Sequence, residues 1–276
     1  MKMKAKTEIR IDVVEHGDGF YDTEEFIEIT FPTAKHLNQF ATNLAKFIKK
    51  EIKPFKIAYN PNFGYQGIVL KEIVKKGNLP LKLTGLNHIP DGTFPKGKPD
   101  PSRKENKTEF VKFVKDSGVD FGVAWDADGD RAFFCTGKGV FVEPYFLNVL
   151  LAKHILKKNK GGKIIHDLRY AWALIDAAVE FGGEVIMERV GHSFIKERMR
   201  KEDAVFAGES SGHAYFKDFW YCDNGIIPLL MVLEILSDGF SLDDLIEPLL
   251  NKYFISGEMN FKALDGDQII EKIKSA

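Results

Sequence analysis

The segment DFGVAWDADGDRAFF, residues 120–134, changes abruptly from apolar to acidic. Its first part, DFGVAW, is an apolar run typical of a buried strand in a parallel sheet. Asp126, Asp128 and Asp130 then follow at every second position, and Arg131 comes directly after them. Alternate side chains of an extended chain point the same way, and open α/β sheets bind ligands at the carboxyl ends of their strands. We therefore expect three carboxylates gathered at a sheet edge.

Three carboxylates at one place need a partner of opposite charge. Like charges within a few ångströms raise one another's pKa values and resist ionising together unless a cation neutralises them. Oxygen ligands favour a hard cation, and Mg²⁺ is usually bound by carboxylates, water and substrate phosphate. The sequence therefore predicts a Mg²⁺ site at Asp126, Asp128 and Asp130.

Other interpretations of the same residues stay open at this point. Asp-rich, Gly-containing segments are common surface turns. An EF-hand loop fits poorly, because its sixth and twelfth positions should be Gly and Glu but are Arg131 and Gly137. A phosphatase of the haloacid dehalogenase type also places D-x-D after an apolar strand, and Asp126 would then be a nucleophile.

Strand and helix patterns alternate on both sides of this segment. An amphipathic helix is expected from Pro32 and Thr33 to Lys50. The alternation predicts an α/β fold with two tandem α/β domains, each a mixed sheet flanked by helices. A Lys, Asn and Gly-rich break, KKNKGGK, predicts a linker at residues 157–163. The expected strands are FKIAY, LKLTGL, DFGVAW, KIIHD, EVIMERV and AVFAGE, and the expected helices are GIVLKEIVKKG, TEFVKFVKDSG, WALIDAAVEFGG, SFIKERMRK and GIIPLLMVLEIL.

The expected organisation has four parts. They are an N-terminal segment with one helix, an α/β domain with the aspartates, a second α/β domain, and a C-terminal segment, at residues 1–52, 53–158, 159–256 and 257–276. Within the second part, residues 87–106 contain four prolines and two glycines, which exclude regular structure. The composition is not that of a flexible linker, so we expect a stiff, ordered loop.

Two further polar segments are candidates for binding. The segment GESSGH, residues 208–213, offers Glu209, Ser211 and His213 on a loop that suits hydrogen bonds to sugar hydroxyls. Arg189 and His192 stand between an expected strand and an expected helix N-terminus, where an anion such as phosphate can bind. A structural loop, a surface ion pair and a helix cap are the plainer interpretations of these residues.

Composition limits the class of protein. Lys and Arg number 39 against 40 Asp and Glu, so no overall field would draw the molecule to nucleic acid or to a membrane. The two cysteines, Cys135 and Cys222, are far apart and form no metal-ligand pair, which favours a reducing compartment. No apolar run suggests a membrane span or a signal peptide, so the cytoplasm is expected.

Together these segments resemble the α-D-phosphohexomutase superfamily, the phosphomannomutases and phosphoglucomutases. DADGDR is similar to that family's metal loop and GESSGH to its sugar-binding loop, and RVGHSFIKERM and PDGTFPKGKPDPSRKEN are similar to neighbouring stretches. The resemblance covers the family's second and third domains. It implies transfer of a phosphoryl group between the C1 and C6 oxygens of a hexose through a bisphosphate, with glucose, mannose or glucosamine phosphate as substrate.

The resemblance also implies roles for single residues. Asp126, Asp128 and Asp130 would bind Mg²⁺, and Arg131 would support the phosphoryl group. The remaining residues would bind the substrate: Glu209 and Ser211 the sugar hydroxyls, with Arg189, His192 and His213 completing the pocket.

The sequence departs from the family at the phosphate carrier. Family members use a serine in a T-A-S-H-N-P-like loop, and a loop like R-x-S-G-T-E-P clamps the distal phosphate. The nearest segment here, TAKHLN at residues 33–38, has Lys35 at the serine position, and neither Ser193 nor Ser211 is placed like a carrier. We therefore expect a mutase that is incomplete in this chain, with the missing domains supplied either in trans by another chain or by an absent portion of a longer gene product. A homologue that binds sugar phosphate without turnover is the alternative, so whether the chain is an enzyme stays open.

Overall fold

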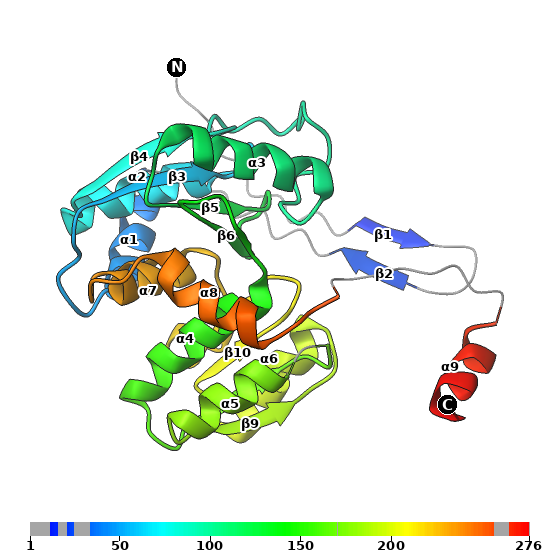
Figure 1. Ribbon diagram of the computed structural model, residues 1–276. Helices are drawn as coiled ribbons and strands as arrows, with labels where there is room; N and C mark the ends of the chain where they lie inside the picture. The colour runs from blue at the N-terminus through cyan, green and yellow to red at the C-terminus, as the bar shows by residue number, and fades with distance from the viewer. Residues whose placement is uncertain (1–11, 16–20, 25–33, 170, 257–264, 276) are drawn as a thin grey trace.

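The computed structural model describes residues 12–15, 21–24, 34–169, 171–256 and 265–275. Two five-stranded mixed sheets flanked by helices form the body of the molecule, as the sequence predicted. Figure 1 shows the first sheet above the second, with helices α7 (Ile226–Leu236) and α8 (Leu242–Lys252) between them. A separate antiparallel pair, β1 (Asp12–Glu15) and β2 (Tyr21–Glu24), precedes them in the chain.

The first sheet has the strand order β4-β3-β5-β6-β7. Strands β3, β4 and β5 are parallel, whereas β6 and β7 continue the sheet in antiparallel pairs. Strand β5 is buried along its whole length, as expected for a strand covered on both faces. The elements of this half are α1 (Ala34–Ala45), β3 (Phe55–Asn60), α2 (Gln66–Gly77), β4 (Leu81–Gly85), α3 (Lys104–Ser117), β5 (Phe121–Trp125), β6 (Ala132–Thr136) and β7 (Phe141–Val142).

The second sheet has the order β12-β11-β10-β8-β9. Here β8, β9 and β10 are parallel, and β11 and β12 follow in antiparallel pairs. The elements are α4 (Pro144–Lys158), β8 (Lys163–His166), α5 (Trp172–Glu180), β9 (Glu184–Met187), α6 (His192–Glu202), β10 (Phe206–Gly208), β11 (Ala214–Phe216), the 3₁₀ helix η1 (Lys217–Phe219) and β12 (Cys222–Asp223), followed by α7, α8 and, after residues 257–264, α9 (Gly266–Ser275).

The two sheets have the same topology. In each, the second strand pairs on one side of the first and the third on the other, and the chain then returns antiparallel to the third. The connection from β5 to β6 is residues 126–131, which we call the aspartate loop, and the connection from β10 to β11 is residues 209–213, which we call the serine loop. The two candidate segments thus occupy equivalent positions in the two halves.

One hydrophobic cluster joins the two halves. It includes residues of β5, α4 and α7, and these two helices are buried over most of their surface. Pro144 at the first position of α4 fits a helix start, because its missing N–H would lack a partner there in any case. Because α7 is covered on all sides, its segment GIIPLLMVLEIL carries apolar residues around the whole helix.

Most expected elements are present, and the differences have local reasons. The predicted start of the first helix at Pro32 and Thr33 lies outside the described residues. Its predicted end at Lys50 was wrong, because α1 stops at Ala45 and tightens into bonds from residue i to i−3, such as Phe47 N to Leu44 O at 2.9 Å. Sequence reasoning did not name the following elements: β1, β2, β6, β7, α4, β11, β12, α8 and α9.

The proline-rich loop is ordered as predicted, although its last residues begin α3. The side chain of Asn106 stabilises the loop by donating hydrogen bonds to the carbonyls of Lys98 and Asp100 at 2.9 and 2.8 Å. The proposed linker at residues 157–163 comprises the end of α4 and the turn into β8. None of the described helices is long and apolar enough to cross a membrane.

Candidate functional site

The aspartate loop gathers three carboxylates at the carboxyl end of β5. Asp126, Asp128 and Asp130 each offer an oxygen atom, and these atoms lie within 4.8 Å of one another. Asp126 is only 2% exposed. Oδ1 of Asp130 is buried and receives no hydrogen bond from any residue that the structure describes. A buried oxygen without a donor is costly, so this atom marks a place where a cation would be stabilising.

Arg131 is the positive charge closest to these acids. Its Nε donates to Oδ2 of Asp126, and its backbone N–H donates to Oδ1 of the same residue at 3.2 Å. Its Nη1 lies 3.8 Å from Oδ2 of Asp100, at the end of the proline-rich loop. The guanidinium is thus held on two sides, with about a quarter of the side chain exposed.

The pKa values of the three acids differ in direction. Burial raises the pKa of Asp126 to about 8, although Arg131 acts against it. Burial and the charge of Asp130 raise the pKa of Asp128. Burial would raise the pKa of Asp130 too, but His213 and Arg131 outweigh it and the pKa lies below its ordinary value. The positive side chains nearby therefore leave the pKa values of Asp126 and Asp128 raised, and the all-oxygen donor set fits Mg²⁺.

Neighbouring segments fix the backbone of the aspartate loop. The side chain of Asn62 donates to the carbonyl of Trp125 at 2.7 Å, and that of Gln66 to the carbonyl of Gly129 at 3.0 Å. Gly129 has a φ of +73°, and a Cβ there would lie 1.7 Å from Nε2 of Gln66, so only glycine fits. From the second half, the backbone N–H of Gly225 donates to the same carbonyl at 3.2 Å.

The serine loop contains a buried acid of its own. Glu209 is 2% exposed, and its Oε2 accepts a 2.6 Å hydrogen bond from the hydroxyl of Tyr215, which is fully buried. Its Oε1 accepts from the backbone N–H of Gly191 at 3.3 Å. Next to it, Oγ of Ser211 lies 2.8 Å from Nδ1 of His213. The loop is thus held by the helix start at Gly191 and by β11.

The two loops meet directly. Arg131 and His213 form an isolated antiparallel bridge, and the N–H of Ala132 donates to the carbonyl of Gly212 at 3.3 Å. Nε2 of His213 lies 3.4 Å from Oδ2 of Asp130. Five of the predicted site residues, Asp126, Asp130, Arg131, Glu209 and His213, therefore form one connected group with Asp128 and Ser211 beside it.

Arg189 and His192 lie on the adjoining turn. The guanidinium carbon of Arg189 is 3.2 Å from the ring centroid of Phe194, and His192 is the first residue of α6. The bond from Gly191 to Glu209 places this turn beside the serine loop. The predicted role of both residues in anion binding stays a prediction.

Three polar residues near the site were not named as site residues from the sequence. They are Asp100 beside Arg131, Tyr215, which donates to Glu209, and Asp167 after β8. Asp167 gave a signal, because it ends the expected strand KIIHD at a carboxyl edge. Asp223, the first residue of the segment DNG, lies with Asp130 and His213 in a second group of possible metal ligands.

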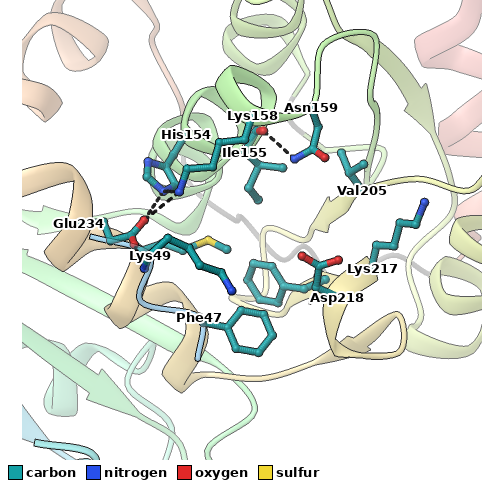
Figure 2. A pocket seen from close by; sticks show the side chains of 12 residues that line it. Phe47, Lys49, His154, Ile155, Lys158, Asn159, Val205, Lys217, Asp218 and Glu234 are labelled. Carbon is teal, nitrogen blue, oxygen red and sulfur yellow. Dashed lines mark hydrogen bonds and ion pairs between the residues drawn. The ribbon is translucent and has the colours of Figure 1, made fainter. Parts of the chain in front are cut away.

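A cavity of about 230 Å³ lies elsewhere, between the chain after α1, the end of α4, η1 and α7 (Figure 2). Its buried acid, Glu234, is already neutralised, because His154 and Lys158 lie 2.8 and 3.1 Å from its Oε2. Its lining contains none of the three aspartates. We therefore place the candidate site at the two loops.

Comparison with known proteins shows the family. Residues 34–139 match the family model described as phosphoglucomutase/phosphomannomutase, alpha/beta/alpha domain II, and residues 143–253 match the model for domain III. The chain belongs to the phosphoglucomutase/phosphomannomutase family. The matched regions divide between residues 139 and 143, and the boundary predicted after residue 158 stays a prediction.

Relatives of this mutase-family chain are longer than it is. It is 42% identical over 226 residues to a protein of Xanthomonas campestris named phosphohexose mutases, a match that spans 82% of this chain and 50% of that protein. It is 38% identical over 269 residues to a phosphomannomutase of Vibrio cholerae, spanning 95% of this chain and 58% of that one. The chain thus spans about half the length of the curated relatives it matches.

A crystal structure from the same family has a similar fold. It is the phosphoglucomutase/phosphomannomutase family protein of Burkholderia thailandensis, with a TM-score of 0.71 and 29% sequence identity, and the match covers 87% of this chain and 51% of that one.

Proposed function

We propose that this chain provides the Mg²⁺-binding and sugar-binding parts of a phosphohexomutase, which moves a phosphoryl group between the C1 and C6 oxygens of a hexose phosphate. The observation that supports this most is the contact between the two loops, where Nε2 of His213 lies 3.4 Å from Oδ2 of Asp130. A phosphoryl group bound at the aspartate loop would then be next to the hydroxyls of a sugar bound at the serine loop.

Each residue has a definite task in this proposal. Asp126, Asp128 and Asp130 would bind Mg²⁺, which supplies the positive charge that the phosphoryl oxygens need during transfer. Arg131 would add a second, fixed positive charge, because its bond to Asp126 holds it in place before substrate arrives.

The serine loop would hold the sugar. Ser211 and His213 are part-exposed and can bind hydroxyl groups. The carboxylate of Glu209 would strengthen this grip from below, since its bond to Tyr215 fixes it at the base of the loop. Arg189 and His192, on the turn that contacts Glu209, would bind the phosphate at the other end of the sugar.

Turnover also needs a phosphate carrier and a clamp for the distal phosphate. No segment of this sequence has the T-A-S-H-N-P-like pattern of the family's phosphate carrier. In the nearest match, residues 33–38, Lys35 stands at the serine position. We propose that the carrier serine and the clamp come from outside residues 1–276, either from another part of the same protein or from another chain, and act on the site described here. Glucose, mannose and glucosamine phosphates are the candidate substrates.

An Asp-nucleophile phosphatase is a weaker proposal. Asp126 is 2% exposed, and both its oxygens accept hydrogen bonds from Arg131. A nucleophile must approach the phosphorus atom in line with the leaving group, which this covered carboxylate cannot do. A metal ligand needs only one oxygen near the other ligands, and an oxygen of Asp126 lies within 4.8 Å of those of Asp128 and Asp130.

Metal binding provides the first test. A calorimetric titration of the metal-free chain with Mg²⁺ should show one binding site. Asp128→Asn should lower the Mg²⁺ affinity at least tenfold, because one of the ligands loses its charge. Asp116→Asn, an exposed residue of α3, is the matched control and should leave the affinity unchanged. Equal affinity in wild type and Asp128→Asn would mean that the aspartate loop is not the metal site.

Turnover provides the second test. The chain is incubated with glucose 1-phosphate or mannose 1-phosphate, Mg²⁺ and a hexose bisphosphate, and the 6-phosphate is measured. We expect binding of the sugar phosphate without product. Product formed by residues 1–276 alone would refute the assignment of the carrier to a place outside them, and release of inorganic phosphate that is lost in Asp126→Asn would favour the phosphatase.

A further inference from the structure

Asp167 follows β8, and its side chain is almost completely buried beside the serine loop. Its Oδ2 accepts hydrogen bonds from the backbone N–H and the hydroxyl of Ser210, at 2.7 and 2.6 Å. Its Oδ1 accepts from the backbone N–H of Arg169 at 2.9 Å, and Nη2 of Arg169 lies 3.0 Å from Oδ2. The residue is 2% exposed. One buried carboxylate therefore receives four hydrogen bonds from two separate segments.

The sheet explains why these segments meet. Strands β8 and β10 are parallel neighbours, and His166 pairs with Gly208. The residues that follow these two strands emerge at the same edge of the sheet, so Asp167 reaches the loop that begins at Glu209. Ser210 is the loop residue that turns its N–H and its hydroxyl toward β8, and it stands between Glu209 and Ser211, the two residues assigned to the sugar.

We propose that Asp167 is a positioning residue for the sugar-binding loop, which it holds through Ser210 in the conformation that presents Ser211 and Glu209 to a hexose phosphate. This rests on the proposed function of the serine loop. Asp167 itself does not touch the sugar, and its effect on binding is indirect.

The charge of Asp167 is essential to this role. Burial acts to raise its pKa, but the hydrogen bonds from Ser210 and Arg169 outweigh burial, and the pKa lies below its ordinary value. An ionised carboxylate is a pure acceptor, whereas the amide of asparagine offers one acceptor oxygen and two donor hydrogens. Asn at this position therefore offers fewer acceptor sites to the donors of Ser210 and Arg169. Arg169 is exposed, so water can accept from it, whereas the cavity beside Asp167 and Ser210 measures about 10 Å³, roughly the room that a single water needs.

The test combines amide exchange with ligand binding in the full chain. Asp167→Asn is compared with wild type and with the exposed control Asp116→Asn. We expect the amide hydrogen of Ser210 to exchange at least tenfold faster in Asp167→Asn, as measured by NMR, while that of Ala207 in β10 is unchanged. The dissociation constant for glucose 1-phosphate or mannose 1-phosphate should rise at least tenfold, while Mg²⁺ affinity stays within twofold of wild type.

Ser210→Ala is the second variant, because it removes only the hydroxyl bond and disturbs the fold less. It should raise the dissociation constant of the sugar phosphate about threefold or more. Three results would overturn the proposal: unchanged exchange at Ser210 in Asp167→Asn, faster exchange with sugar-phosphate affinity within twofold of wild type, or no effect of Ser210→Ala if Asp167→Asn fails to fold. Failure of the proposed function itself is recognised separately, because wild type would then bind neither sugar phosphate.

Discussion

Glu234 should contribute strongly to stability although it lies far from the two loops. Its side chain on α7 is 1% exposed, and Figure 2 shows His154 and Lys158 directed at its carboxylate. The backbone N–H of Lys49, in the chain between α1 and β3, also donates to it. One buried charge thus ties three segments together, and Glu234→Gln removes the charge while keeping the shape.

The magnitude follows from the pKa. Burial alone would raise the pKa of Glu234, but hydrogen bonds from His154, Lys49 and Lys158 lower it from 4.5 to about 2. Each pKa unit corresponds to about 1.4 kcal/mol of stability, which gives about 3 kcal/mol at neutral pH. The side chain of Lys158 is 51% exposed, and water screens that contact, so we expect Glu234→Gln to lower the free energy of unfolding by about 2–3 kcal/mol.

The pH dependence gives a sharper test of the same reasoning. A carboxylate whose folded pKa is depressed stabilises the fold above its unfolded pKa, and this contribution is lost as the pH falls from about 4.5 toward 2. Urea unfolding at pH 7 and pH 3.5 should therefore show a wild-type advantage over Glu234→Gln that shrinks by about 1 kcal/mol at the lower pH. Glu247→Gln, at an exposed position of α8, should change stability by less than about 0.5 kcal/mol. An advantage below 0.5 kcal/mol at pH 7, or one that is equal at both pH values, would refute the argument.

Two further predictions concern the two loops. A Cβ at Gly225 would lie 2.5 Å from the carbonyl oxygen of Gly129, so Gly225→Ala should displace the aspartate loop and weaken Mg²⁺ binding at least tenfold, as measured by calorimetry. Gly92→Ala is the control, because a Cβ there meets no atom within 4 Å, and it should leave Mg²⁺ binding unchanged. If Gly225→Ala also binds Mg²⁺ as tightly as wild type, the close approach of Gly225 to Gly129 does not shape the aspartate loop. Tyr215→Phe removes the 2.6 Å bond to Glu209 and should lower the free energy of urea unfolding by about 1.5–3 kcal/mol, because the bond is to a buried charge. A loss below 0.5 kcal/mol would contradict this account of the serine loop.

Local pattern was sufficient for most of the fold. Strand β5 was predictable because its five residues are all buried and carry no polar side chain. Helix α7 was predictable because an apolar run of that length must be covered on all sides. The end of α1 was not, because Phe47 and Ile48 continue the helical pattern. The helix ends earlier since the backbone N–H of Lys49 bonds to Glu234, which is 185 residues away in the chain.

The candidate site divides in the same way. The aspartates were identifiable as a candidate site because they follow a buried strand at alternate positions, and three like charges held together are stabilised by a cation. Tyr215 was not identifiable as a support for Glu209, because a tyrosine in a short strand is ordinarily a core residue. Its hydroxyl acquires a role only because β11 places it below the serine loop.

The amino-acid sequence by itself determined the kinds of functional group available: carboxylates suited to a hard cation after β5, and a carboxylate, a hydroxyl and an imidazole after β10. Only the tertiary structure decided that these two sets lie in direct contact. The reason is physical, since the two sheets share a topology that brings the two loops to equivalent edges, and backbone bonds such as Ala132 N to Gly212 O, which no side-chain pattern encodes, join them.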